Sequence, residues 1–177
     1  ASTAAESASD GFTVADGLAR RGRSVRGRGL GALTFDDGPY PTWTPQILNI
    51  LKADCVPGTF FDVGMNAEAN PARVQQESAQ GNIVANHTYS HLDLTVLPLW
   101  RAKLEIRAGN WVLQGITGRE PTLFRSPYGA LELTDSQSAT HQDRASSLGM
   151  QPVGGTVDPV DWPRPGVQKI ARPATAS

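Results

Sequence analysis

The segment TFDDGP, residues 34–39, sets two carboxylates side by side at the end of an apolar run and then stops the chain with Gly38-Pro39. The preceding run LGALTF, residues 30–35, is typical of a buried strand. Two adjacent carboxylates repel, and each raises the pKa of the other unless a positive charge lies beside them. Asp36 and Asp37 therefore predict a cation at the end of this strand.

Apolar runs alternate with amphipathic stretches along the rest of the chain. Thr44 as N-cap and Pro45 at the first helical position open one helix, and a second helix closes on Gly81. The expected strands are residues 30–35, 58–63, 82–86, 122–127 and 151–158, and the expected helices are residues 44–53, 70–81, 96–114 and 135–148. This alternation predicts an α/β fold with a parallel sheet covered by helices, either open or closed into a barrel. In such folds the chemistry lies where the carboxyl ends of the strands meet.

The longest expected helix spans residues 96–114 and accommodates Pro98 in its first turn. Its large apolar residues recur on one face and are predicted to form the inner stripe: Leu97, Trp100, Leu104 and Trp111. We therefore interpret Trp100 and Trp111 as core residues rather than as a binding surface.

The composition of the chain is that of one globular domain. Its 177 residues can build one sizeable core, and 39% hydrophobic with 19% charged residues is not a disordered composition. A net charge of -1 predicts attraction neither to nucleic acid nor to membranes, and no apolar stretch approaches the roughly 20 residues that span a bilayer. Residues 1–29 are rich in glycine and arginine and predict a flexible segment ahead of a domain at residues 30–177. The single cysteine excludes an internal disulfide.

Two of the three histidines follow the third expected strand, in NHTYSH, residues 86–91. On a helical turn or a tight loop, the spacing of His87 and His91 points both imidazoles the same way, as two ligands of one metal require. A lone pair of this kind is equally typical of surface decoration, and a lone Asp-Asp-Gly-Pro is equally typical of a turn. Together, at the ends of successive strands, the two pairs predict a metal site.

Two histidines and one carboxylate give three protein ligands and an open position, which is the arrangement of a catalytic zinc site. A metal there lowers the pKa of bound water and polarises a carbonyl group. The second aspartate is then free to accept the proton of that water. The residue pattern alone leaves open which of Asp36 and Asp37 is the ligand and which is the base.

Two later motifs supply further groups. In FRSPYG, residues 124–129, Arg125 can hold a catalytic carboxylate ionised, and a backbone N–H of the turn can face a developing oxyanion. In VDPVDWP, residues 157–163, Asp161 can pair with Arg125, and Trp162 offers a flat apolar wall to a sugar ring. Each motif by itself is also good structural turn chemistry.

Other activities fit the residues less well. Two histidines and a carboxylate also form the facial triad of non-haem iron oxygenases, but the helical signals argue against the all-β scaffold of such enzymes. An aspartate-nucleophile phosphatase would separate its two aspartates by one residue, and here they are adjacent.

Four motifs in order, TFDDGP, HTYSH, RSPYG and DPVDW, resemble the polysaccharide deacetylase family, also called the NodB-homology domain or carbohydrate esterase family four. The similarity runs from about residue 31 to about residue 170. The resemblance implies a distorted (β/α) barrel and a divalent metal, usually zinc or cobalt. It also implies hydrolysis of acetyl groups from chitin oligomers, peptidoglycan or acetylxylan.

Roles for individual residues follow from the resemblance. It implies that Asp36 is the general base and that Arg125 orients it. The implied metal ligands are Asp37, His87 and His91.

The resemblance also implies supporting roles around these groups. Asp161 would tether Arg125, and the backbone N–H of Tyr128 would contribute to the oxyanion site. Pro127, Tyr128 and Trp162 would line the substrate groove.

Members of the family usually continue to a strand with a Leu-x-His motif, whose histidine protonates the leaving amine. Only fifteen residues follow Trp162, and none is histidine, so we expect a barrel that is incomplete at the C-terminus and a missing general acid. His141, in an expected helix, is a poor substitute because a catalytic acid needs the right geometry first. The alternative is therefore a carbohydrate-binding fragment that keeps the metal site and turns over slowly or not at all.

The expected partner is an acetylated polysaccharide or oligosaccharide, bound by a monomer. The N-terminus shows no uncleaved signal peptide, but a mature secreted protein would look the same. We expect a secreted or cell-wall-associated protein.

Overall fold

The computed structural model describes residues 31–129, 145–161, 163, 164, 166 and 168. The expected flexible segment at residues 1–29, most of the expected helix at residues 135–148, and the side chains of His141 and Trp162 lie outside these residues. Within the described part of the chain, no helix is long and apolar enough to cross a membrane.

Within the described residues, five parallel strands form one sheet, in which their order follows their order in the chain. The strands are β1 (Leu33–Gly38), β2 (Gly58–Asp62), β3 (Ile83–Asn86), β4 (Leu123–Phe124) and β5 (Gln151–Pro152). The α-helices are α2 (Trp43–Ala53), α3 (Gly64–Ala69), α4 (Pro71–Ala79) and α5 (Leu99–Thr117), and η1 (Pro127–Gly129) is a short 3-10 turn. The predicted α/β class with a parallel sheet is confirmed.

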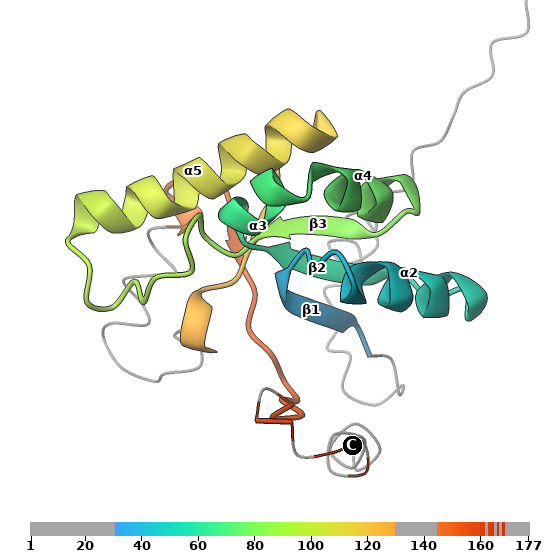
Figure 1. Ribbon diagram of the computed structural model, residues 1–177. Helices are drawn as coiled ribbons and strands as arrows, with labels where there is room; N and C mark the ends of the chain where they lie inside the picture. Colours follow the sequence, from blue (N-terminus) through green and yellow to red (C-terminus); the bar gives the residue numbers. More distant parts are fainter. Residues whose placement is uncertain (1–30, 130–144, 162, 165, 167, 169–177) are drawn as a thin grey trace, which may run out of the picture. The chain divides into compact units, whose positions relative to one another are not determined.

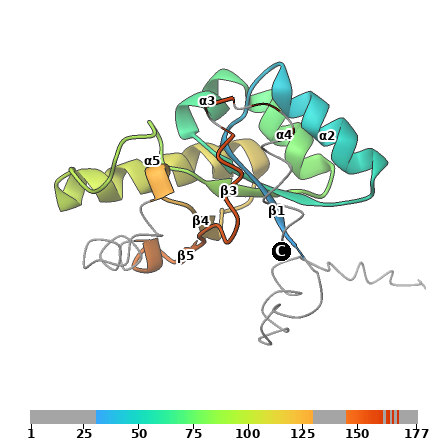
Figure 2. The same cartoon turned by 90° about the horizontal axis from the view of Figure 1, so that it is seen from below.

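The helices follow one another around the sheet, with α2 beside α4 and α4 beside α5 (Figures 1 and 2). Apolar residues from the strands and helices fill the space between them in three clusters. One joins α2 to β2 through Leu48, Leu51 and Phe60, and a second joins the short helices to α5 through Ala67, Val74 and Leu113. A third contains residues before, within and after α5: Leu94, Ala102, Ile106, Phe124, Ala145 and Met150.

The start of α2 differs slightly from the prediction. The helix begins at Trp43, so that Thr42 and not Thr44 is in the N-cap position. The hydroxyl of Thr44 instead accepts a hydrogen bond of 2.9 Å from the N–H of Tyr40. Thr44 thus ties the first turn of the helix to the loop that follows the two aspartates.

Helix α5 runs later along the chain than the expected residues 96–114. Pro98 is its N-cap because a proline has no N–H to add to a helix and fits best at its edge. At the other end the helix continues to Thr117 and stops at Gly118, whose φ of 70° is the left-handed conformation that commonly ends helices.

The predicted inner stripe of α5 is wrong for three of its four residues, whereas Leu97, which precedes the helix, is partly buried and packs against the third cluster. Trp100 and Trp111 are 67% and 62% exposed, and Leu104 is also exposed. The residues that the helix buries are Ala102, Glu105, Ile106, Gly109, Asn110 and Leu113. The physical reason is close approach: a Cβ at Gly109 would lie 2.9 Å from the carbonyl oxygen of Thr88, so only small residues allow the helix to lie this near the loop.

Candidate metal centre and active site

A bulge at the end of β1 gives the two adjacent aspartates different directions. Asp36 pairs with Phe61 of β2 and Gly38 pairs with Asp62, which leaves Asp37 as an extra residue with a φ of 66°. Side chains of neighbouring residues in a regular strand point to opposite faces, and a bulge re-aims one of them. Asp36 and Asp37 can therefore both face the active-site end of the sheet while contacting different partners.

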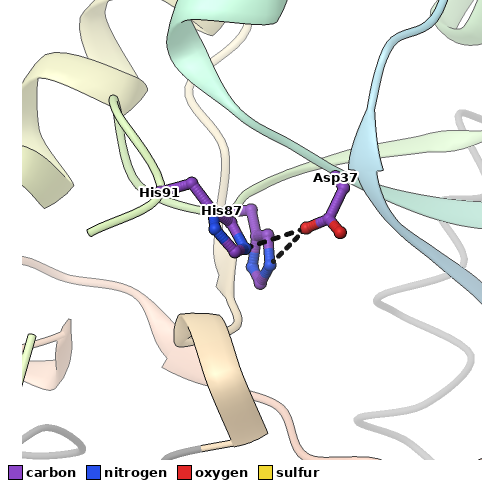
Figure 3. Close-up of side chains that lie close together, drawn as sticks. All are labelled: Asp37, His87 and His91. Atoms are coloured by element: carbon purple, nitrogen blue, oxygen red, sulfur yellow. Dashed lines mark ion pairs between the residues drawn. The ribbon is translucent and has the colours of Figure 1, made fainter. Parts of the chain in front are cut away.

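Asp37 faces the two histidines that follow β3. Its Oδ1 lies 3.3 Å from Nε2 of His87 and 2.9 Å from Nε2 of His91 (Figure 3). The two imidazole rings lie 5.0 Å apart, centroid to centroid. The structure thus brings together the three side chains that the resemblance assigns to the metal, one from the end of β1 and two from the loop after β3.

The orientation of the His87 ring is set by its other nitrogen. Nδ1 lies 2.8 Å from the backbone carbonyl oxygen of Arg125, which can only accept a hydrogen bond. A neutral His87 therefore carries its proton on Nδ1 and directs the lone pair of Nε2 toward Asp37. A carbonyl partner of this kind is typical of histidines that bind metal.

His91 reaches the same point from a strained turn. The backbone φ angles of Thr88 and His91 are 68° and 57°, in the left-handed region that residues with a side chain seldom adopt. The N–H of His91 donates a hydrogen bond of 3.1 Å to the hydroxyl of Thr88. This contact closes the turn and brings the two histidine rings to the same side of the loop.

The three groups perturb one another's proton affinity. When the rings carry a proton on Nε2, hydrogen bonds from His87 and then from His91 hold the pKa of Asp37 well below its usual range. The hydrogen bond to Asp37 raises the pKa of His91. Asp37 is therefore held in its ionised form, which is the form in which a carboxylate can bind a metal.

The donor set fits a divalent metal. One ligand atom from each of Asp37, His87 and His91 lies within 4.8 Å of the others. In a tetrahedral zinc site with bonds of about 2.0–2.2 Å, the ligand atoms are about 3.3 Å apart. The lone pair of His87 Nε2 and the carboxylate oxygen of Asp37 face each other at 3.3 Å, which requires a proton or a metal ion between them.

Asp36 is held by an arginine instead. Nη1 of Arg125 donates to Oδ1 of Asp36 at 2.7 Å and to the hydroxyl of Thr34 at 2.9 Å. The remaining guanidinium nitrogens bond the carbonyl oxygens of Val153 and Gly154, both at 3.2 Å. The guanidinium carbon also lies 4.2 Å from the centre of the Phe61 ring, a cation–π contact. The Arg125 side chain is thus fixed by contacts that do not involve Asp36.

The expected tether of Arg125 by Asp161 is not formed. Among the described residues, the ion-pair partner of Arg125 is Asp36, and Asp161 is exposed, with its backbone carbonyl oxygen accepting the N–H of Arg164. The physical reason is that the guanidinium donors already bond Thr34, Asp36 and two backbone carbonyl oxygens of residues 153 and 154. Thr34 was not anticipated as a partner, although it lies two residues before Asp36 and so shares its face of the strand.

Tyr128 lies against His91, one of the three side chains of the candidate metal site, whereas Pro127 is buried. The Tyr128 ring is 4.9 Å from the His91 ring in an edge-to-face contact, and its hydroxyl lies 3.4 Å from the carbonyl oxygen of His91. Tyr128 is 69% exposed, and its φ of 60° is again left-handed. Pro127 is buried, so it supports the turn rather than forming an open wall. Trp162, the other expected wall, lies outside the described residues.

Comparison with known proteins gives a consistent result. A family model for polysaccharide deacetylases matches residues 25–153. The chitooligosaccharide deacetylase of Rhizobium leguminosarum bv. trifolii is 38% identical over 138 residues, an alignment that covers 78% of this chain and 61% of that protein. The chain thus spans less than two thirds of the length of this relative.

Two solved structures of this type share the fold. Peptidoglycan deacetylase PdaC from Bacillus subtilis has a TM-score of 0.72 and 34% identity, covering 82% of this chain and 68% of that one. A family 4 carbohydrate esterase from Streptomyces lividans in complex with acetate has a TM-score of 0.72 and 32% identity, covering 82% and 72%. The parallel sheet with its covering helices is therefore that of the distorted barrel expected from the sequence motifs.

Proposed function

The chain belongs to the polysaccharide deacetylase family, and on that premise we propose that it is a metal-dependent hydrolase that removes acetyl groups from an acetylated polysaccharide. The observation that carries the proposal is the convergence of Asp37, His87 and His91 beside an aspartate that is separately paired with Arg125. Such a site contains a set of metal ligands and a carboxylate that is left over for proton transfer.

Asp37, His87 and His91 would hold the metal, and zinc is the ion that best suits two imidazoles and one carboxylate, with cobalt as a substitute. When bound, such an ion supplies Lewis-acid chemistry: it lowers the pKa of a water molecule and polarises the acetyl carbonyl group. Three protein ligands leave a position open for this purpose.

Asp36 is the proposed general base. Its side chain is 34% exposed, so water can reach it, and the charge-assisted hydrogen bond from Arg125 fixes its orientation. Asp36 takes up the proton of the attacking water, and hydrolysis requires that a proton reach the leaving nitrogen or oxygen as acetate departs. Because Asp36 and Asp37 are consecutive, the base lies next to a metal ligand without being one.

Tyr128 is proposed to assist the same step through its backbone. The N–H of a residue in a tight turn can donate to the oxygen on which negative charge develops. Tyr128 lies in η1 against His91, which brings this turn to the proposed metal site. Its exposed ring would form part of the sugar-binding surface.

The proposed substrates are chitin oligomers, peptidoglycan or acetylxylan. Similar proteins named chitooligosaccharide and peptidoglycan deacetylases support the first two, and acetylxylan follows from the resemblance of the sequence motifs. A protein that acts on such polymers works outside the cell or at the cell wall, and we propose that location and a monomeric state. A slow or inactive carbohydrate-binding protein is the second candidate, favoured by the absence of an ion pair between Asp161 and Arg125 in the described residues.

Acetate release tests the proposal. The full chain is freed of metal with a chelator, loaded with zinc or cobalt, and incubated with chitin oligomers, peptidoglycan or acetylxylan. We expect acetate release from at least one polymer that depends on the added metal. Binding of metal and sugar without acetate release would favour the second candidate, and absence of metal binding would contradict both.

A further inference from the structure

Glu105 of α5 is a buried carboxylate that the proposed chemistry does not use. It is 2% exposed, and its Oε2 accepts two hydrogen bonds from Ser90: one of 2.9 Å from the backbone N–H and one of 2.8 Å from the hydroxyl. Its Oε1 pairs with Arg101 at 3.1 Å. A buried carboxylate is tolerated only where donors satisfy it. Here both donors on one oxygen come from a single residue of the loop at residues 87–91, called the histidine loop below.

Ser90 immediately precedes His91 in a loop that does not hold its shape by itself. Thr88 and His91 have left-handed backbone angles of 68° and 57°, which persist only where the surroundings impose them. The start of the loop is held by Asn86, whose Oδ1 accepts the N–H of Thr88 at 2.7 Å. Asn86 is itself bonded to α5 through the carbonyl oxygen of Ile106, at 2.8 Å.

The end of the loop depends on Glu105 in the same way. Helix α5 therefore holds the loop at two points. One is Asn86, just before the turn, and the other is Ser90, within it. Gly109 permits this contact because the helix backbone lies against the carbonyl oxygen of Thr88.

We propose that Glu105 is a positioning residue for the metal centre: by accepting both hydrogen bonds of Ser90, its carboxylate fixes the backbone that aims His91 at Asp37. Glu105 touches neither the reacting atoms nor the metal ligands' side chains. This inference rests on the proposed metal-dependent function, since it concerns the geometry of the same ligand set.

The ion pair with Arg101 is secondary. The Arg101 side chain is 42% exposed and lies one helical turn from Glu105, and exposed pairs of this kind contribute little. The important property of Glu105 is thus the acceptor oxygen that faces Ser90. A glutamine retains such an oxygen at the same length, whereas an alanine removes it.

Zinc affinity of the full chain tests this assignment. The parent and the variants Glu105→Ala, Glu105→Gln and Arg101→Ala are titrated with zinc against a chromophoric chelator. We expect Glu105→Ala to bind zinc about 10- to 100-fold more weakly, which is the usual effect of removing a partner that orients a ligand. Glu105→Gln and Arg101→Ala should stay within about threefold of the parent, because both keep an acceptor for Ser90.

Leu113→Ala is the matched control for a large side chain removed from the buried face of the same helix. Leu113 packs against Ala67 and Val74 rather than against the loop, so its truncation should lower stability without changing zinc affinity. A cobalt-loaded sample adds a spectroscopic readout, because the absorption bands of cobalt should change in Glu105→Ala and not in Leu113→Ala.

Ser90→Ala covers the case in which Glu105→Ala does not fold. It removes the hydroxyl and keeps the backbone N–H, so we expect zinc binding about tenfold weaker than in the parent. Parent-like affinity in Glu105→Ala or Ser90→Ala, or Glu105→Gln as weak as Glu105→Ala, would overturn the positioning role alone. A parent chain that binds no zinc would overturn the proposed function as well.

Discussion

Two pairs of carboxyl groups lie at the same end of the sheet. One pair is stabilised by positively charged partners and the other by a retained proton. Asp36 and Asp37 are partly exposed, and each has its own cationic partner: Arg125 for Asp36, and the two histidines for Asp37. Asp62, at the end of β2, and Glu77, on α4, are both 0% exposed and have no cationic ion-pair partner among the described residues.

The buried pair is stabilised by a proton. If both groups were ionised, none of their four carboxyl oxygens would have a hydrogen-bond donor in the part of the chain that the structure describes. Asp62 and Glu77 each affect the pKa of the other, and a proton retained by the pair supplies a donor that the two ionised groups would lack. Burial is the main cause that raises the pKa of Asp62 and of Glu77.

Gly38 lies between Asp37 of the exposed pair and Asp62 of the buried pair. A Cβ at Gly38 would lie 2.7 Å from Oδ1 of Asp62, so the backbone after Asp37 packs directly on the buried carboxyl. Asp62 also accepts the N–H of His87 through its carbonyl oxygen, at 3.0 Å. The comparison teaches that proximity of carboxyls does not itself make a metal site, because a site also needs ligands of another kind and access to solvent.

The largest effect is expected from Asp37→Ala. This change removes the oxygen on which both histidines converge, so we expect zinc affinity to fall by more than about 100-fold, beyond the effect of losing an outer partner. Acetate release should fall to background. Isothermal titration with zinc measures the first, and Asp54→Ala, at an exposed position after α2, is the control. If Asp37→Ala bound zinc like the parent, the ligand set would be wrong.

Asp36→Ala should separate metal binding from catalysis. Asp36 pairs with Arg125 and not with the histidines, so zinc affinity should stay within a few-fold of the parent. Loss of the general base should lower kcat by about 10²- to 10⁴-fold. Zinc titration and acetate release on the same sample test both halves. A variant that lost zinc and activity together would remove the distinction between the two aspartates.

The broad fold could be predicted because it depends on local patterns. The alternation of apolar runs with capped helices indicated a parallel sheet, and motifs at the ends of successive strands indicated where its active edge lies. The spacing of His87 and His91 and the Asp36-Asp37 pair are local as well, which is why residue types alone marked them. The bulge that turns Asp37 away from Asp36 left no signal in the residue pattern, so the pattern could not separate their roles.

The errors concern contacts between distant residues. Both faces of α5 have helical periodicity, and the large size of Trp100 and Trp111 favoured their face as the buried one. In the structure the buried face is that of Gly109, because it allows the helix to pack closely on the histidine loop. Glu105 and the Asp62–Glu77 pair had no local signal, because their partners are 15 residues away in the sequence. A buried carboxyl is recognisable only when its surroundings are known.

Arg125→Lys should have an intermediate effect. Lysine keeps the charge near Asp36 but not the planar fork that also bonds Thr34 and the carbonyl oxygens of residues 153 and 154. We expect kcat to fall about 10- to 100-fold. Zinc affinity should be preserved, because His87 is oriented by the backbone carbonyl of this residue rather than by its side chain. A parent-like kcat would show that a point charge suffices to hold Asp36.

Glu77→Gln tests the buried pair through the pH dependence of stability. In the unfolded chain, Asp and Glu lose their protons above about pH 4, whereas the native pair retains one because its pKa values are raised. The native state then binds more protons than the unfolded state, so the unfolding free energy falls as pH rises above about 4, by up to about 1.4 kcal/mol per pH unit. The unfolding free energy stops falling once the pH exceeds the raised pKa at which the native pair loses its proton.

A glutamine at position 77 donates an amide N–H to Asp62 and needs no proton. The variant should match the parent near pH 5 and become more stable than the parent as the pH rises, by up to about 4 kcal/mol at pH 8, which is about 1.4 kcal/mol for each of the three pH units. Urea unfolding of metal-free protein across this range measures the difference, and protons bound by the histidine cluster cancel because both proteins share it. Parallel stability curves for parent and variant would mean that the pair does not hold a proton, and the contrast between the two carboxyl pairs would then fail.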